Sequence, residues 1–179
     1  MNATADNTHI AALVVKVQNG EDAARGELIV ATQNRLFKFC LLLSHRREQA
    51  DDLCQETFIK AFQSIHKLNN PETFLGWMYQ IAKNLFIDMK RSAASRKNVS
   101  EDSLKGLSYE SNEDLILSVQ KALSDFEESD KLLLLLVELE GHSYKEAAEI
   151  LGVSEDSVRS RLHRLRLLFI KKYNSNETN

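Results

Sequence analysis

The chain has 179 residues, 43% of them hydrophobic, which is enough for one ordinary domain or two small ones. Its single proline and six glycines favour long helices over sheets and tight turns, so we expect an all-α protein. The formal net charge of −3 and the isoelectric point near 6.0 argue against nonspecific coating of nucleic acid.

We expect neither export nor membrane insertion from the N-terminal residues and the longest apolar run. The first residues, "MNATADNTHI", lack the basic segment and apolar stretch of a signal peptide. The longest apolar run, Leu132 to Val137, is far too short to cross a bilayer and predicts a buried core helix. We therefore expect a cytoplasmic protein without direct membrane insertion.

The two cysteines, Cys40 and Cys54, have the spacing of neither a zinc pair nor a redox pair. The five histidines add no metal-like spacing to them. We interpret both cysteines as reduced core residues, and we expect no metal and no cofactor.

Apolar residues recur at helical spacing over residues 9–45, where Gly20 is expected to separate two helices. The next segment, "QADDLCQETFIKAFQSIHKL", predicts a helix with two distinct faces. Its apolar stripe consists of Cys54, Phe58, Ala61, Phe62 and Ile65. Its second face carries Asp52, Gln55, Glu56 and Ile59.

The segment "NNPE", residues 69–72, contains the only proline and interrupts the helical pattern. Another helix is predicted to follow, "ETFLGWMYQIAKNLFIDMKRS". Its expected apolar stripe is Phe74, Trp77, Met78, Ile81 and Leu85. Lys83, Asn84, Asp88 and Arg91 lie away from that stripe.

Helical periodicity is lost over residues 93–112, where Ser, Lys and Asn dominate, so we predict a flexible linker. Helices resume over residues 113–173, and residues 174–179 are expected to form a disordered tail. The predicted fold is two small helical domains, residues 1–92 and 113–173, joined by this linker.

A helix-turn-helix is predicted within the second domain. Ser143 and Glu146 fit a capping box at the start of its first helix, and Gly152 fits the end of that helix. Ser154 fits the next N-cap, and that second helix turns Val158, Leu162 and Leu165 inward. The pattern therefore predicts a helix free to enter a major groove.

Arg159, Ser160, His163 and Arg164 lie on the face of this second helix that points away from Val158 and Leu162. Arginine can bond guanine through two hydrogen bonds, and Ser or His can reach base edges or phosphates. Arg161 and Arg166 sit further round, and we expect them to meet phosphates or acidic side chains. A solvated basic helix in a bundle is the alternative, but the caps and the glycine-centred turn favour DNA binding.

Charge is distributed unevenly along the chain. Residues 83–97 hold five Lys or Arg and one acidic residue. Residues 154–173 hold six Lys or Arg and two acidic residues, so each segment carries a net charge of +4. Acidic residues collect instead over residues 48–56 and 113–130. The pattern suggests nucleic acid at two places and another partner between them. Trp77 lies near the first basic segment, as in single-strand binders, but its place on the apolar stripe favours a core role.

Three segments, "ADDLCQETFIKAF", "FLGWMYQIAKNLFIDMKRS" and "GHSYKEAAEILGVSEDSVRSRLHRLR", resemble bacterial RNA polymerase sigma factors of the extracytoplasmic-function (ECF) group, in the sigma-70 family. The first two resemble conserved region 2 and the third resembles region 4, in the right order. The resemblance covers roughly residues 9–173.

The resemblance implies a transcription initiation factor, not an enzyme, that brings RNA polymerase core to specific promoters. Region 4 would read the −35 element through Arg159, Ser160, His163 and Arg164. Region 2 would capture the unpaired non-template strand of the −10 element. Its implied contacts are the specificity loop Asn69, Asn70, Pro71 and Glu72, and the strand path Lys83, Asn84, Asp88 and Arg91.

The implied partners are promoter DNA, polymerase core and an anti-sigma factor. Asp52, Gln55, Glu56 and Ile59 would dock on the β′ clamp helices of the core, and the second domain would meet its β flap. A polar, acidic patch with one exposed Ile suits a docking face. Local basic surfaces would then meet DNA, while acidic surfaces serve protein contacts.

Two other interpretations predict different properties. A stand-alone helix-turn-helix regulator would bind duplex DNA and use the first domain for sensing or dimerisation. An enzyme would need a metal site, for which Asp51, Asp52 and Glu56 could be imagined as ligands. However, no E-x-x-H pair, glycine-rich phosphate loop or nucleophile motif accompanies them.

Overall fold

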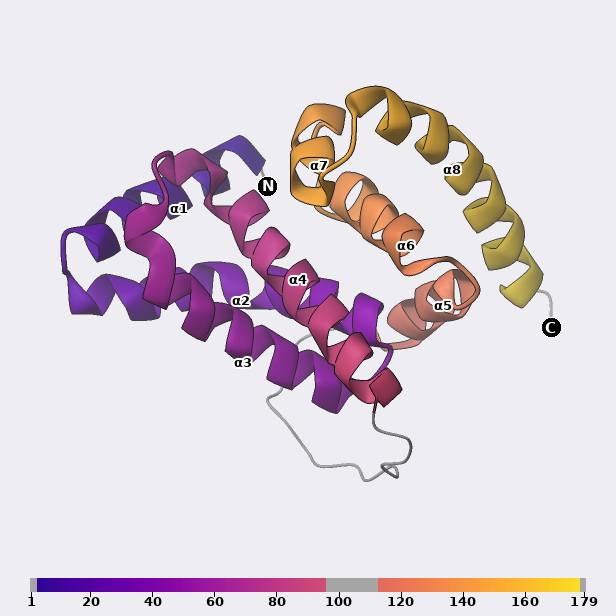
Figure 1. Ribbon diagram of the computed structural model, residues 1–179, viewed down its shortest axis with the longest axis horizontal. Coiled ribbons are helices and arrows are strands. Elements are labelled where there is room, and N and C mark those ends of the chain that lie inside the picture. Colours follow the sequence, from indigo (N-terminus) through magenta and orange to yellow (C-terminus); the bar gives the residue numbers. More distant parts are fainter. Residues whose placement is uncertain (1–2, 96–112, 178–179) are drawn as a thin grey trace.

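The computed structural model describes residues 3–95 and 113–177, and all regular structure in these ranges is helical. The helices form two groups, α1 to α4 and α5 to α8, which lie against each other (Figure 1). The expectation of an all-α fold is confirmed. The predicted linker, residues 93–112, falls largely outside the described residues, except that the preceding helix continues through Ser95.

The N-terminal group contains four α-helices and two short 3₁₀ turns. Gly20 adopts a positive φ of 87° after the first helix, and His45 ends the second helix in the left-handed conformation. Pro71 begins the second 3₁₀ turn, where its missing N–H costs no hydrogen bond. The elements are α1 (Ala3–Gln18), α2 (Asp22–Ser44), α3 (Arg47–Ser64), η1 (Ile65–Lys67), η2 (Pro71–Thr73) and α4 (Phe74–Ser95).

The C-terminal group consists of α5 (Glu113–Leu123), α6 (Glu128–Leu134), η3 (Leu135–Leu139), α7 (Tyr144–Leu151) and α8 (Glu155–Glu177). The apolar run from Leu132 is buried up to Leu136, as predicted. It continues α6 into a π-helical turn, η3. Helix α8 extends to Glu177, beyond the expected helix end at residue 173, so the predicted disordered tail is largely helical.

Both cysteines are buried and free, which confirms their interpretation as reduced core residues. Burial raises the pKa of the Cys54 thiol to about 12 and raises the pKa of Cys40 as well. Neither thiol is therefore expected to be reactive.

The apolar stripe of α4 differs from the prediction. Phe74 and Met78 are fully buried, but Trp77, Ile81 and Leu85 are only partly buried. The remaining buried positions are Leu75, Tyr79, Ala82 and Phe86. The reason is that α4 packs against α3 on one side and against α7 of the other group on another, so its buried surface is wider than one stripe.

The two helical groups share an interface that the sequence did not predict. Helix α4 contacts α7, and α2 contacts both α5 and α6. In Figure 1, α8 lies on the far side of the C-terminal group from α4. Every helix within the described ranges is too short or too polar to cross a lipid bilayer.

Candidate nucleic-acid interface

The predicted helix-turn-helix is present, with each of its expected caps. The Ser143 side chain accepts a hydrogen bond from the Glu146 N–H, and the Glu146 carboxylate accepts one from the Ser143 N–H at 2.8 Å. Gly152 ends α7 with a φ of 71°, and the Ser154 hydroxyl accepts a bond from the Ser157 N–H at 3.2 Å. Because these caps are local, α7 begins and ends, and α8 begins, where the sequence predicted.

Helix α8 buries Val158, Leu162 and Leu165 completely or nearly so, as predicted. The four residues expected to read DNA all lie exposed on other faces of the helix: Arg159, Ser160, His163 and Arg164. The structure therefore brings these four side chains together on one accessible surface. Such a surface can offer hydrogen-bond donors to base edges in a major groove.

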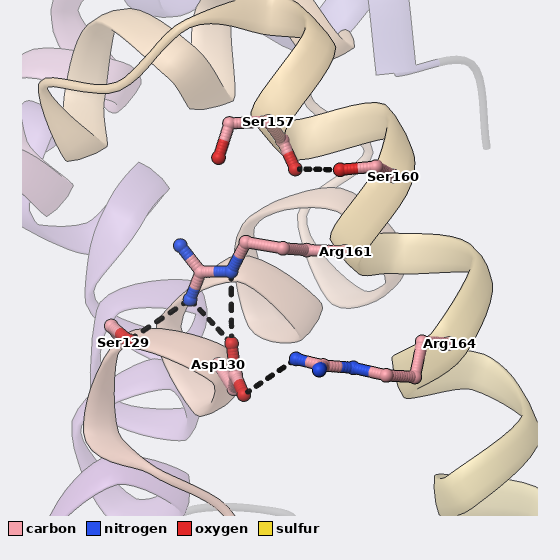
Figure 2. Close-up of polar contacts among 6 residues, drawn as sticks. All are labelled: Ser129, Asp130, Ser157, Ser160, Arg161 and Arg164. Atoms are coloured by element: carbon pink, nitrogen blue, oxygen red, sulfur yellow. Dashed lines mark hydrogen bonds and ion pairs between the residues drawn. The ribbon is translucent and has the colours of Figure 1, made fainter.

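Two arginines of α8 are held by acidic side chains, one of the alternatives expected from the sequence. Arg161 bonds to Asp130 and to the Ser129 hydroxyl of α6 (Figure 2). Arg166 donates to Glu138 at 2.7 Å and to the Tyr144 hydroxyl at 3.2 Å. These contacts anchor α8 on its own domain.

The two arginines predicted to read DNA, Arg159 and Arg164, are only partly neutralised. Arg164 lies 3.9 Å from Asp130, yet its side chain is 66% exposed. Figure 2 shows Arg164 approaching one carboxylate oxygen of Asp130 while Arg161 bonds to the other. Arg159 pairs with Glu155 at 3.1 Å within its own helix. Of the two arginines predicted to read DNA, Arg164 therefore has the greater freedom to turn toward a ligand.

The predicted specificity loop is exposed and internally braced. Asn69, Asn70 and Glu72 are exposed, and Pro71 is partly buried. The Asn70 side-chain oxygen accepts a hydrogen bond from the Glu72 N–H at 3.1 Å, and the Thr73 hydroxyl donates to the Asn70 carbonyl. This bracing presents the loop in one conformation next to α4.

The four residues of α4 predicted to line the path of the −10 strand are not all exposed. Asn84, Asp88 and Arg91 are exposed, and Arg91 lies 3.8 Å from Asp88. Lys83 is instead partly buried, and its ammonium donates to the Ile150 carbonyl of α7 at 2.8 Å. Burial lowers the pKa of Lys83. In this arrangement Lys83 serves the contact between the two helical groups.

The second face of α3 is exposed, as the docking prediction requires. Asp52, Gln55, Glu56 and Ile59 are all exposed, and Ile59 is 50% exposed. A cavity of about 320 Å³ opens beside Gln55 and Ile59. The cavity is also lined by Ile29, Gln33, Asp51, Cys54 and Phe58. An apolar side chain of a partner could enter it, a feature that the helical pattern of α3 alone did not reveal.

Sequence reasoning missed a polar cluster between the two groups. The buried Glu140 carboxylate accepts hydrogen bonds from Arg35 at 3.2 Å and from the Tyr79 hydroxyl. The His142 ring meets Tyr79 edge-on at 5.6 Å. These residues come from α2, α4 and the turn before α7, and no local pattern relates them.

The side chains imagined as metal ligands lie on α3. Within the described ranges, no group of three or more His, Cys, Asp or Glu side chains could hold a metal ion. Of the imagined ligands, Asp52 and Glu56 are exposed on α3, and Glu56 lies 3.6 Å from Lys60.

These features describe a two-domain helical protein with a helix-turn-helix in its second domain. Residues 28–96 match the family Sigma-70 region 2, and residues 116–168 match the family Sigma-70, region 4. The chain therefore belongs to the sigma-70 family, in its ECF group, whose members are transcription initiation factors. The region 2 match does not favour the stand-alone regulator, which requires no such domain.

Several curated relatives support this assignment. ECF RNA polymerase sigma factor SigC of Mycobacterium tuberculosis is 30% identical over 172 residues, covering 93% of this chain and 92% of the relative. The ECF RNA polymerase sigma-E factor of Haemophilus influenzae is 31% identical over 177 residues, covering 90% and 93%. SigE of Mycolicibacterium smegmatis is 34% identical over 149 residues, covering 78% of this chain and 58% of that longer protein.

Solved structures share the fold. CnrH in complex with the cytosolic domain of CnrY superimposes with a TM-score of 0.72 at 21% identity, covering 93% of this chain and 97% of CnrH. RpoE of Bartonella quintana, in complex with the anti-sigma factor NepR, gives a TM-score of 0.69 at 23% identity, covering 83% and 96%.

Proposed function

We propose that this sigma factor reads its promoters at two separate surfaces. The C-terminal domain, residues 113–173, places α8 in the major groove of the −35 element through Arg159, Ser160, His163 and Arg164. The observation that carries this proposal is the division of α8 into a buried apolar face and an exposed polar face behind a capped turn. The caps hold the helix at a defined angle to its domain, which a major-groove reader needs.

The N-terminal domain, residues 1–92, serves the −10 element in this proposal. An extruded base enters the loop Asn69 to Glu72, and the unpaired strand continues along Asn84, Asp88 and Arg91, with Lys83 added once it is accessible. Extrusion costs unstacking energy, which new hydrogen bonds in the loop offset. Asn69 and Asn70 suit this role because amide side chains both donate and accept.

The β′ clamp helices of the polymerase core bind the exposed face of α3 formed by Asp52, Gln55, Glu56 and Ile59. The β flap of the core meets the C-terminal domain. The adjacent cavity supports this choice because it can receive an apolar partner side chain beside Ile59. The chain acts by binding rather than by catalysis. It works in the cytoplasm, where polymerase and promoters are found, and an anti-sigma factor restrains it.

Run-off transcription tests this function. Core polymerase is incubated with and without the protein on a pool of fragments from the source genome. Discrete transcripts that require the protein, with start sites preceded by two shared sequence elements, are the expected result. Duplex binding in a gel shift without any transcript would contradict the proposal.

A further inference from the structure

An exposed aspartate lies on the same face of α8 as the residues proposed to read the −35 element. Asp156 is the second residue of the helix, and its side chain is exposed. It precedes Arg159, Ser160 and His163 by three, four and seven positions, a spacing that places all four side chains on one face of an α-helix. We call this face, together with Arg164, the reading face. The N-terminal residues of a recognition helix are the ones that meet base edges, so Asp156 enters the groove first.

The Asp156 carboxylate is available to a ligand. Within residues 3–95 and 113–177, no hydrogen bond or ion pair holds it. Arg159 pairs instead with Glu155, at 3.1 Å between Nη2 and a carboxylate oxygen. The guanidinium carbon of Arg159 also lies 5.7 Å from the centroid of the Tyr144 ring. Arg159 is thus held on its own domain from two sides, and it leaves the charge of Asp156 unpaired.

Ser160 adds a second hydrogen-bond acceptor next to Asp156. Its hydroxyl donates to the Ser157 carbonyl at 3.2 Å, so the hydrogen of this hydroxyl is already used within α8 (Figure 2). The remaining lone pairs of the Ser160 oxygen can only accept, and an ionised carboxylate also accepts without donating. The first part of the reading face therefore presents acceptors, whereas Arg164 presents donors one turn beyond Ser160.

An acceptor at this position discriminates among the four bases in a major groove. Guanine presents two acceptors there, and thymine presents one acceptor and a methyl group. Adenine has a donor, N6–H₂, but this donor lies between adenine N7 and thymine O4, which are both acceptors. Cytosine N4–H₂ has an acceptor on one side only. Because acceptor atoms and phosphates repel a carboxylate, cytosine is the base that suits Asp156 best.

The positions of Asp156 and Arg164 on α8 predict how far apart their bases lie. The eight positions between them correspond to about 12 Å along the helix, at 1.5 Å per residue. Base pairs follow one another every ~3.4 Å, so a helix lying along the groove brings the two side chains to base pairs about three to four apart. Arg164 can bond guanine through two hydrogen bonds.

We infer that Asp156 is a specificity-determining residue that selects a cytosine in the −35 element, an inference that rests on the function proposed above. Its carboxylate accepts a hydrogen bond from the N4–H₂ group of this cytosine, about three to four base pairs from the guanine bonded by Arg164. With guanine or thymine at the same position, the carboxylate faces an acceptor and stays unpaired beside the DNA. Asp156 therefore weakens binding to most sequences and spares those that carry the cytosine.

Selection from a pool of randomised duplexes tests this role. The full-length chain is mixed with the pool at fixed salt, and the bound duplexes are isolated by gel shift and sequenced over several rounds. Wild type is compared with Asp156→Asn and Asp156→Ala. Glu149→Gln, which removes an exposed acid from α7, is the matched control. Circular dichroism first establishes that each variant is folded.

Wild type is expected to enrich cytosine over each other base about fivefold or more at one position, as for one discriminating base contact. Asp156→Asn should move the preference at that position to adenine, because a carboxamide can bond adenine N6 and N7 together. Asp156→Ala should accept all four bases there about equally. The preferences at other positions, and the complete profile of Glu149→Gln, should match wild type.

Selected duplexes without a preferred cytosine would overturn the inference, and so would Asp156 variants that keep this preference. A change of affinity that is equal for all sequences would overturn it as well. An acid that only stabilises the helix N-terminus or repels phosphates does not distinguish bases.

The selection needs no polymerase, so its outcome is separate from that of run-off transcription. Transcripts from wild type with no base preference that depends on Asp156 would overturn only the inference. A cytosine preference that depends on Asp156, without any transcript, would overturn the proposed sigma function and leave Asp156 as a specificity residue for duplex DNA.

Discussion

The pairing of Asp130 with Arg161 should stabilise the helix-turn-helix domain measurably. Asp130 is 15% exposed and Arg161 is 23% exposed, and two guanidinium nitrogens bond to the carboxylate (Figure 2). Asp130→Asn keeps the side-chain shape but removes the charge, which leaves Arg161 poorly paired in a largely buried position. Loss of a hydrogen bond to a charged group typically costs about 1.5–3 kcal/mol, so we expect the free energy of unfolding to fall by about 2 kcal/mol.

Urea unfolding followed by circular dichroism checks this value, and the expected fall in Tm is about 4–8 °C for a chain of this size. Asp22→Asn is the control, because Asp22 and Arg25 form an exposed pair at 3.7 Å that should contribute less than about 0.5 kcal/mol. A double-mutant cycle with Arg161→Gln isolates the interaction itself. If Asp130→Asn costs no more than Asp22→Asn, the reasoning from burial is wrong.

Three further predictions follow from the proposed sites. Arg164→Ala should weaken binding to a −35 duplex about tenfold or more in a gel shift at fixed salt, as for loss of one base contact. Loss of core binding by this variant in a pull-down would contradict the assignment of Arg164 to the −35 element. Asp52→Arg combined with Glu56→Arg should abolish capture of polymerase core, and undiminished holoenzyme formation would exclude the α3 docking face. Hydrogen bonds from Ser143 lower the pKa of Glu146, so the folded state favours the ionised carboxylate. The contribution of this carboxylate to the free energy of unfolding is therefore complete only above the unfolded pKa of about 4.3. The Tm difference between wild type and Glu146→Gln should therefore shrink as the pH falls from 6 to 3, and a constant difference would refute this account of the cap.

Much of the helix-turn-helix could be predicted because its signals are local. The Ser143 capping box, the Gly152 helix end and the Ser154 cap each depend on residues within a few positions of one another. The buried face of α8 follows from the 3.6-residue period in the same way. The exposure of Asp52 and Ile59 on α3 was predictable for the same reason, although the predicted stripe of α3 omitted the buried residues Ala50, Leu53 and Thr57.

Packing between distant segments was not predictable from local pattern. The stripe expected on α4 omitted Tyr79 and Phe86, because a helix packed by neighbours on two sides buries more than one face. The sequence also overestimated how much of the positive charge of residues 154–173 is unpaired at the surface. The acidic residues Asp125, Asp130 and Glu138 come from elsewhere in the chain and pair with Lys172, Arg161 and Arg166.

The sequence by itself determined the class of fold, the order of the two domains and the helix that can read a duplex, since periodicity and helix caps act over a few residues. Only the tertiary structure decided that Arg35, Tyr79 and Glu140 meet and that Lys83 is occupied by α7. These contacts join residues 61 to 105 positions apart. No local rule relates such residues, because their proximity depends on how complete helices pack.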